Sequence, residues 1–276
     1  MTLELAAVTS RAFQAPARAS SISEPAAAYW VLRLGAAFCF IGHGAFGFIA
    51  KQAWVPYFGL VGIPESWAYR LMPLVGAVDV MAGMAVLFAP RGLPLVYMVT
   101  WALWTALLRP LTGESAFETL ERAGNYGVPL ALLTLTLATR SRAGLTSLLP
   151  GPLLSGDVLA RTRVVLRWST VVLLAGHGAL GVTMGNATLP AHYAAIGLPL
   201  GTTVAVGWIE LVLAAAVILR PGVALLLAVA AWKLATESLF IVAGAPVWEF
   251  VERAGSYAAP LALALLVREQ QSSGRV

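Results

Sequence analysis

The chain has 276 residues, of which 59% are hydrophobic and only 11% are charged, and its mean hydropathy is +0.81. A soluble domain carries roughly a quarter charged residues, so this composition excludes an ordinary soluble protein and predicts a polytopic membrane protein. Topology and lipid headgroups account for the net charge of +5, so we expect the lipid bilayer as the chain's surroundings and no nucleic-acid partner.

Residues 1–28 precede the first apolar segment and are rich in Ala, Ser and Pro, with scattered charges such as Arg11 and Arg18. They lack the apolar core of about 7 to 15 residues that a signal peptide needs. We therefore expect a short N-terminal tail outside the membrane.

Eight apolar segments follow, each close to the roughly 20 residues that a membrane-spanning helix requires. They cover residues 29–50, 70–89, 92–109, 118–139, 164–184, 201–219, 222–243 and 250–267. The runs are long and lack the alternation of a membrane barrel, which favours helices. The sequence therefore predicts an all-α membrane protein with about eight transmembrane helices.

The second half of the chain repeats the first. VLRLGAAFCFIGHGAFG and FETLERAGNYGVPLALL in the first half return as VLRWSTVVLLAGHGALG and WEFVERAGSYAAPLALA in the second. This predicts two fused four-helix bundles, at 29–139 and 164–268, joined by a linker at 140–163 and followed by a C-terminal tail at 269–276. With an even number of helices each, the copies form a parallel repeat, which makes alternating-access transport a weaker hypothesis.

Most Lys and Arg residues fall in the predicted tails, the linker and the turns at Arg91 and Arg220, on one side of the membrane. Cytoplasmic loops carry the excess of basic residues in multi-pass proteins. We therefore expect a multi-pass protein of the cell (inner) membrane with both termini in the cytoplasm.

Each predicted bundle places a histidine and a carboxylate inside apolar helices: His43 with Asp79, and His177 with Glu210. An isolated charge in a bilayer costs at least about 2.5 kcal/mol, so each carboxylate must be protonated, paired or exposed to an internal aqueous cavity. We expect a His–carboxylate pair in each half. The pairs could be structural hydrogen bonds between helices, or they could handle protons or contact a ligand.

The second half adds Lys233 and Glu237, four residues apart on one predicted helix, where the first half has Ala102 and Ala106. Ion pairs inside membranes frequently mark functional sites, although a neutralised pair can simply orient helices. We therefore favour the second half as the site of function, with a pocket formed by His177, Glu210, Lys233 and Glu237.

An acidic motif begins the fourth predicted helix of each half. Its charged residues are Glu118, Glu121 and Arg122 in the first half, and Glu249, Glu252 and Arg253 in the second. Residues spaced three or four apart share a helix face, so we expect an internal Glu–Arg ion pair in each motif. The motif is either an interfacial helix start or a polar site at the outer membrane surface. Pro129 and Pro260 should bend or break the helix below the charges.

The sequence gives no pattern for a metal site or a disulfide. Cys39 is the single cysteine, and His192 is the only histidine besides His43 and His177, which disfavours a clamped haem. The aromatic loops near Tyr57 and Tyr193 are expected to cap the bundle at the interface, with a lid over a lipid-soluble substrate as the alternative.

Each half resembles the DoxX-like four-helix membrane proteins. In the first half the similarity is carried by Arg33, His43-Gly44, Lys51, the loop Gly62–Pro64, Asp79 with Gly83, and Glu118 with Glu121. In the second half it is carried by Arg167, His177-Gly178, the loop Gly197–Pro199 and Glu210, while Ala214 stands in place of the glycine.

Some members of that family are similar to membrane subunits of thiosulfate:quinone oxidoreductases, which implies a quinone site and transfer of electrons into the membrane pool. The chain has no Cys pair and no dinucleotide-binding motif, so a redox role would make it a subunit without its own cofactor that works with another membrane or soluble redox subunit. A small-solute or proton transporter or channel and a non-catalytic scaffold or assembly protein are the alternatives.

Overall fold

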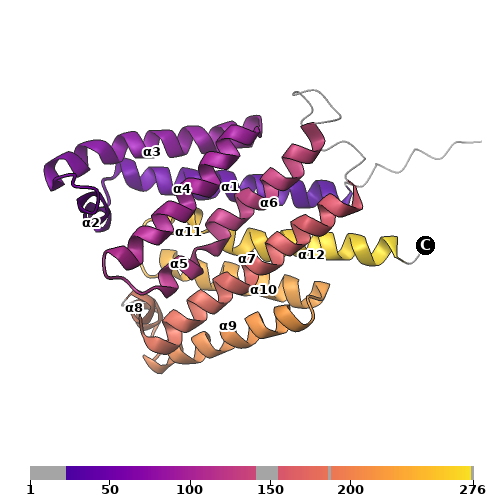
Figure 1. Cartoon of the computed structure of the whole chain (residues 1–276). Helices are drawn as coiled ribbons and strands as arrows, with labels where there is room; N and C mark the ends of the chain where they lie inside the picture. The colour runs from indigo at the N-terminus through magenta and orange to yellow at the C-terminus, as the bar shows by residue number, and fades with distance from the viewer. Residues whose placement is uncertain (1–22, 141–154, 186–187, 275–276) are drawn as a thin grey trace, which may run out of the picture.

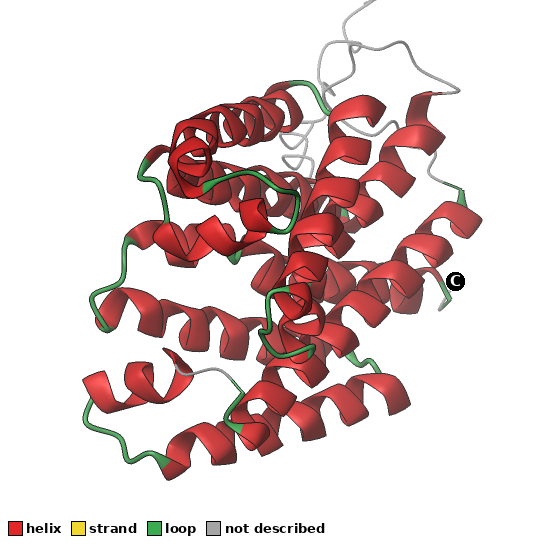
Figure 2. Ribbon diagram, turned by 60° about the vertical axis from the view of Figure 1, so that its left-hand side comes forward, coloured by secondary structure: helices red, strands yellow, loops and turns green. Residues whose placement is uncertain are grey.

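A computed structural model describes residues 23–140, 155–185 and 188–274, and all regular secondary structure in this part of the chain is helical (Figure 2). The helices are α1 (Glu24–Phe48), η1 (Gln52–Trp54), α2 (Val55–Gly59), α3 (Glu65–Phe88), α4 (Gly92–Leu111), α5 (Phe117–Glu121), α6 (Ala123–Arg140), α7 (Gly156–Thr183), α8 (Thr188–Ala195), α9 (Gly201–Leu219), α10 (Val223–Val242), α11 (Val247–Glu252) and α12 (Ala254–Ser273).

Seven helical segments are long and apolar enough to cross a membrane. They are Glu24–Phe48, Glu65–Phe88, Gly92–Leu111, Gly156–Thr183, Gly201–Leu219, Val223–Val242 and Val247–Ser273. The shorter apolar helix Ala123–Ala138 lies where the fourth span was predicted. The chain is therefore a polytopic helical membrane protein, as its composition predicts.

Several helix ends differ from the predicted boundaries. Helix α1 starts at Glu24, inside the predicted N-terminal tail, and α7 starts at Gly156, inside the predicted linker 140–163. An acidic residue lies in the first turn of each, Glu24 and Asp157, where it interacts favourably with the helix dipole. Helix α12 continues to Ser273, inside the predicted C-terminal tail. The remainder of the predicted linker, 141–154, and residues 1–22 lie outside the described residues.

Pro129 and Pro260 were predicted to bend or break the fourth helix of each half, and neither proline breaks its helix. Both prolines lie inside regular helices, α6 and α12, and the breaks come earlier, at Arg122 and Arg253. At each break the chain backbone packs on a glycine of another helix: Gly42 approaches the backbone of Glu252. Backbone packing, and not the proline ring, therefore coincides with the interruption.

Close glycine contacts join the first two long helices of each half. Gly44 of α1 lies against Gly76 of α3, and Gly178 of α7 lies against Gly207 of α9, so near that an added Cβ would meet the opposite backbone at 2.7 Å or less. Small residues at these positions allow helix backbones to approach in a membrane. In Figure 1, α3 lies on one side of the molecule and α9 lies on the other, each packed on the first long helix of its half.

The centre of the bundle mixes the two halves of the chain. Helix α12 packs extensively on α1, and α6 packs on α7, so the last helix of each half contacts the first helix of the other. Gly124 of α6 and Gly255 of α12 touch backbone to backbone. The buried apolar core consequently runs continuously through both halves, from Leu32 and Leu95 to Leu226 and Leu266.

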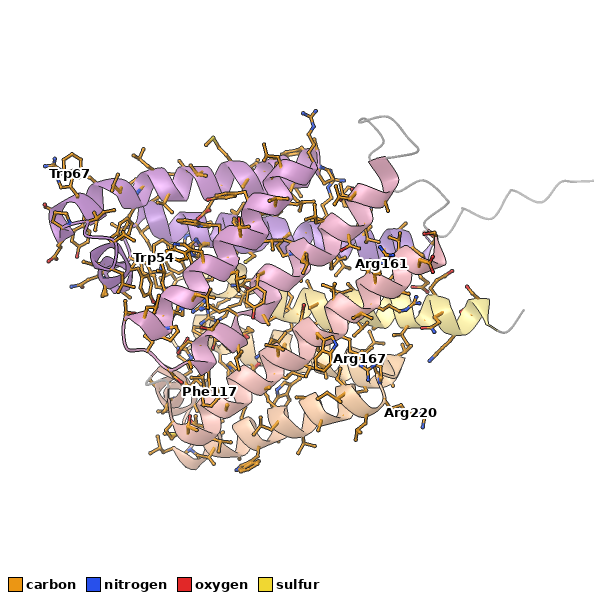
Figure 3. All side chains as sticks on the ribbon, in the orientation of Figure 1. Trp54, Trp67, Phe117, Arg161, Arg167 and Arg220 are labelled. Carbon is orange, nitrogen blue, oxygen red and sulfur yellow. The ribbon has the colours of Figure 1, made fainter. Side chains whose placement is uncertain are left out.

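The two ends of the described bundle differ in character. Arg268 of α12 contacts Glu24 of α1 at 3.3 Å, which places the start of α1 beside the last turns of α12. Figure 3 shows Arg161, Arg167 and Arg220 toward this end, and Trp54 and Trp67 toward the opposite one. We call the opposite end the distal end.

Candidate functional site

In the first half, His43 and Asp79 pair between α1 and α3. The Nδ1 atom of His43 lies 2.8 Å from Oδ2 of Asp79, whose side chain is fully buried. Tyr97 of α4 donates its hydroxyl hydrogen to the other carboxylate oxygen at 2.7 Å. Trp54 stacks on the imidazole, with ring centroids 4.5 Å apart. The predicted pairing in this half is confirmed, while Tyr97 and Trp54 were missed.

The second half forms the equivalent pair between His177 and Glu210, which are hydrogen bonded and buried. Here the neighbours differ. Trp232 donates its indole hydrogen to Glu210 at 3.1 Å, and Lys233 donates to the same carboxylate at 3.2 Å. The four residues of the predicted second-half pocket thus come together, but as a packed cluster, since Lys233 and Glu210 are fully buried and paired.

Charged contacts continue from this cluster to the distal end. Lys233 contacts Glu237 at 3.0 Å, as predicted from their spacing, and Arg253 contacts Glu237 at 3.1 Å. Arg253 also contacts Glu249 at 3.4 Å, and Glu249 accepts a hydrogen bond of 2.7 Å from Lys51. The chain of contacts therefore joins a carboxylate inside the bundle to a lysine contributed by the first half.

The acidic motifs of the two halves also contact each other. Arg253 lies 3.0 Å from Glu252 and 3.9 Å from Glu121 of the first half. Glu118 contacts Arg109 at 3.5 Å, and Arg122 contacts Glu121 at 3.8 Å. The internal pair Glu249–Arg253 is confirmed, and the unpredicted partners arise from the contact of the last helix of each half with the other half.

A cavity of about 210 Å³ lies in the first half, beside His43. We call it the membrane cavity. Its walls are mostly apolar and aromatic. They comprise Cys39, Phe40, His43, Trp54, Tyr57, Phe58, Val61, Ile63, Val75, Trp101, Ala102, Trp104, Thr105, Leu108, Arg109, Arg122 and Asn125.

The membrane cavity lies in the first half, whereas we expected the pocket in the second half. Ala102 lines the membrane cavity, and the residue at the corresponding place in the second half is the buried Lys233. The sequence analysis favoured the second half because of its charged residues, whereas the cavity lies where the first half has Ala102 in place of a lysine. The stacked pair Tyr97 and Trp101, one helical turn apart, is the pattern that could have indicated it.

Two donors at the membrane cavity have no hydrogen-bond partner among the described residues: Nε1 of Trp101 and Nε of Arg122. Both atoms are buried. Buried N–H groups are nearly always paired, because leaving one unpaired costs roughly 1–3 kcal/mol. Trp232, the counterpart of Trp101, donates its indole hydrogen to Glu210. Trp101 and Arg122 both line the membrane cavity, and each carries a buried donor that no acceptor among the described residues takes.

A second, polar cavity of about 490 Å³ lies at the distal end, between the halves. We call it the distal cavity. It shares Trp54, Tyr57, Arg109 and Arg122 with the membrane cavity, so these residues separate the two spaces. Tyr57 donates a hydrogen bond to Glu114, which also pairs with Arg109 at 2.7 Å.

Tyr57 and His192 both line the distal cavity and both are shifted toward their neutral forms. Burial raises the pKa of Tyr57, opposed by Arg109 and supported by the hydrogen bond to Glu114, so Tyr57 keeps its hydrogen for that bond. Burial, together with the positive charge of Arg253, lowers the pKa of His192. His192 is therefore uncharged at neutral pH.

No group of three or more His, Cys, Asp or Glu side chains with the geometry to hold a metal ion occurs among the residues that the structure covers. Cys39 is a buried free thiol on the cavity wall. The functional groups available there are an imidazole, indole and guanidinium donors, an amide and aromatic rings. These groups suit hydrogen bonding, stacking and proton transfer.

Comparison with protein-family models, with curated protein sequences and with solved structures finds no match to this chain.

Proposed function

We propose that the protein is a DoxX-like, quinone-associated membrane subunit that holds the quinone ring in the membrane cavity. The observation that carries the proposal is a largely apolar and aromatic cavity lined by His43 and by Trp101 and Arg122, two residues whose buried donors have no partner among the described residues. A quinone is lipid-soluble and planar, and it presents carbonyl acceptors to such donors.

The charges around the cavity favour a neutral ligand. Arg109 and Arg122 line it, but each already lies near carboxylates: Glu114 at 2.7 Å from Arg109, and Glu121 at 3.8 Å from Arg122. An anion would meet these carboxylates as well as the guanidinium groups. A neutral carbonyl compound accepts hydrogen bonds without that repulsion.

His43 suits the proton exchange that accompanies quinone reduction or quinol oxidation. Its Nδ1 faces Asp79, so Nε2 is the ring nitrogen left for a ligand in the cavity. A carboxylate partner orients an imidazole, and histidine is the side chain most often used for general acid–base proton transfer. In this proposal His43 exchanges a proton with the ring, and Asp79 and Trp54 position it.

The chain's topology completes the proposal. We infer two fused four-helix repeats with eight spans, the α5–α6 and α11–α12 segments being the fourth span of each repeat. The basic residues near the chain ends favour an inner-membrane protein with both termini in the cytoplasm. Electrons would pass to or from another membrane or soluble redox subunit, because the proposed subunit carries no redox cofactor of its own.

One observation favours a second candidate function, a proton or small-solute pathway. The chain of charged contacts from Glu210 through Lys233, Glu237 and Arg253 links the bundle interior to the distal end. If these charged contacts conduct protons or a small solute, the flux into proteoliposomes should fall when Lys233 and Glu237 are both replaced. Unchanged flux in the double variant would remove this candidate.

The quinone proposal is tested on protein extracted from its native membrane in mild detergent. We expect mass spectrometry to find co-purified quinone, and an added ubiquinone analogue to bind at one site per chain. His43→Ala should weaken binding, whereas His177→Ala, in the packed cluster, should act on stability first. Absence of co-purified quinone together with no saturable binding would overturn the proposal.

A further inference from the structure

The membrane cavity is small for a complete membrane quinone. Its volume of about 210 Å³ is below the roughly 300–1,000 Å³ of pockets that enclose a drug-sized ligand. It therefore accommodates a substituted ring and leaves a long apolar chain outside. The place where the cavity reaches the surface determines where such a chain can lie.

The cavity reaches the surface between α3 and α4. Val75 of α3 and Trp104 of α4 both line it, together with Val61, which follows α2. Trp104 is 44% exposed and Val61 is 58% exposed, so the cavity wall at these residues continues onto the outer surface of the bundle. That surface is apolar and lies within or beside membrane-spanning helices.

The packing of α3 explains why an opening exists there. Gly76 of α3 is held against Gly44 and Gly47 of α1, and Gly83 lies against the backbone of Ala37. These contacts draw α3 onto α1, and α3 meets α4 over far fewer residues. Close backbone packing therefore joins α3 to α1, and no comparable contact joins α3 to α4 among the described residues.

We propose that the ligand is a ring with a long apolar tail, and that the tail leaves the membrane cavity between Val75 and Trp104 into the surrounding lipid. This inference rests on the proposed quinone function and adds the ligand class and the route of entry. The ring then enters laterally from the bilayer, past Val61, and does not pass through the polar distal cavity. The occupant is a membrane-resident quinone, as opposed to a water-soluble one.

Photolabelling tests the route directly. The full-length protein, reconstituted in phospholipid nanodiscs, is irradiated with a ubiquinone analogue that carries a diazirine in its chain close to the ring, and the labelled peptides are mapped by mass spectrometry. We expect label on α3 and α4 around Val75 and Trp104, and we expect excess unlabelled decylubiquinone to remove it.

A matched pair of variants sharpens the test. Val75→Trp should fill the route and lower the competed label on α3 and α4 by at least about tenfold, in keeping with the cost of overpacking. Val206→Trp, at the corresponding place in the second half, should leave it unchanged. If Val75→Trp fails to fold, Val61→Trp, at an exposed position, replaces it.

The outcomes separate the two proposals. Competed label on other helices, or label on α3 and α4 that Val75→Trp and Val61→Trp both leave unchanged, would overturn the tail route and keep the quinone site. No competed label anywhere in the protein would overturn both, because it would show that no saturable site exists.

Discussion

The two histidine–carboxylate pairs use the same chemistry with different neighbours. Aspartate is one methylene shorter than glutamate, and at Asp79 the second oxygen is taken by Tyr97, whereas at Glu210 it is taken by Trp232 and Lys233. The tryptophan of the first half is thereby left without an internal acceptor. One small change in side-chain length thus accompanies the difference between a donor kept for a ligand and a donor used for packing.

Trp101→Phe should therefore affect quinone binding, and Trp232→Phe should affect stability. Trp101→Phe removes a donor that the protein does not use, so quinone binding should weaken by roughly 3- to 10-fold, the value of one hydrogen bond, with little loss of stability. Trp232→Phe removes a hydrogen bond to the buried Glu210 and should destabilise the protein by about 1–3 kcal/mol.

Equilibrium quinone titration and thermal unfolding in the same detergent measure both effects of this pair. Equal loss of quinone binding in the two variants would contradict the assignment of the ligand site to the first half.

Lys233 should be the most sensitive residue of the second-half cluster. Lys233→Met leaves Glu210 and Glu237 without their common cation in a fully buried place, and removal of one partner of a buried pair costs roughly 3–5 kcal/mol. The half-exposed pair of Glu24 and Arg268 gives the control, because Glu24→Gln at such a site should change stability by less than about 1 kcal/mol.

Unfolding in detergent with increasing SDS compares the two variants. Similar stability of Lys233→Met and Glu24→Gln would show that the Lys233 cluster does not contribute to the stability of the fold. That result would favour the second candidate function, in which the cluster conducts protons or a small solute.

Among the elements, the packing of α3 on α1 positions both His43 with Asp79 and the route between α3 and α4. A Cβ on Gly76 would lie 2.4 Å from the carbonyl oxygen of Gly44, which is backbone and cannot rotate away. Gly76→Ala should therefore push α3 from α1, lower stability by about 1–3 kcal/mol and weaken quinone binding.

Gly59→Ala is the control for this change, because nothing lies within 4 Å of the added atom. It should be neutral or slightly stabilising. Thermal unfolding and quinone titration are measured for both variants. Wild-type stability and quinone affinity in Gly76→Ala would show that neither property requires this close contact between α1 and α3.

The helices themselves could be predicted, because a bilayer demands long apolar segments and their composition is visible in the sequence. The pairing of His43 with Asp79 followed from similar depth, and that of Lys233 with Glu237 from helical spacing. The breaks at Arg122 and Arg253 could not be predicted, since they coincide with backbone contacts to distant glycines. The membrane cavity was missed because its lining residues come from several helices and the loop after α2, and the spacing of charged residues along one helix does not predict an empty volume between helices.

At the scale of the whole molecule, the two halves depend on each other. Gly42 of α1 packs on the backbone of Glu252, Gly176 of α7 packs on the backbone of Glu121, and Arg253 contacts Glu121. The last helix of each half thus covers the first helix of the other half. A half on its own would expose these small-residue surfaces and leave several charged groups of the acidic motifs without partners.

Division of the chain within residues 141–154 should consequently yield two fragments that are unstable alone and assemble when they are produced together. The contact of Gly124 with Gly255 lies at the crossing of α6 and α12, and an added Cβ on either would meet the opposite backbone at 2.5 Å or less. Gly255→Leu should therefore abolish assembly, while Gly274→Leu, near the end of α12 and with only one atom within 4 Å of an added Cβ, should preserve it. Affinity purification through a tag on one fragment measures recovery of the other. Recovery of each fragment alone as a stable unit, with quinone bound to the first, would show that the halves are independent, because the first half would then keep its fold without the backbone of Glu252 against Gly42.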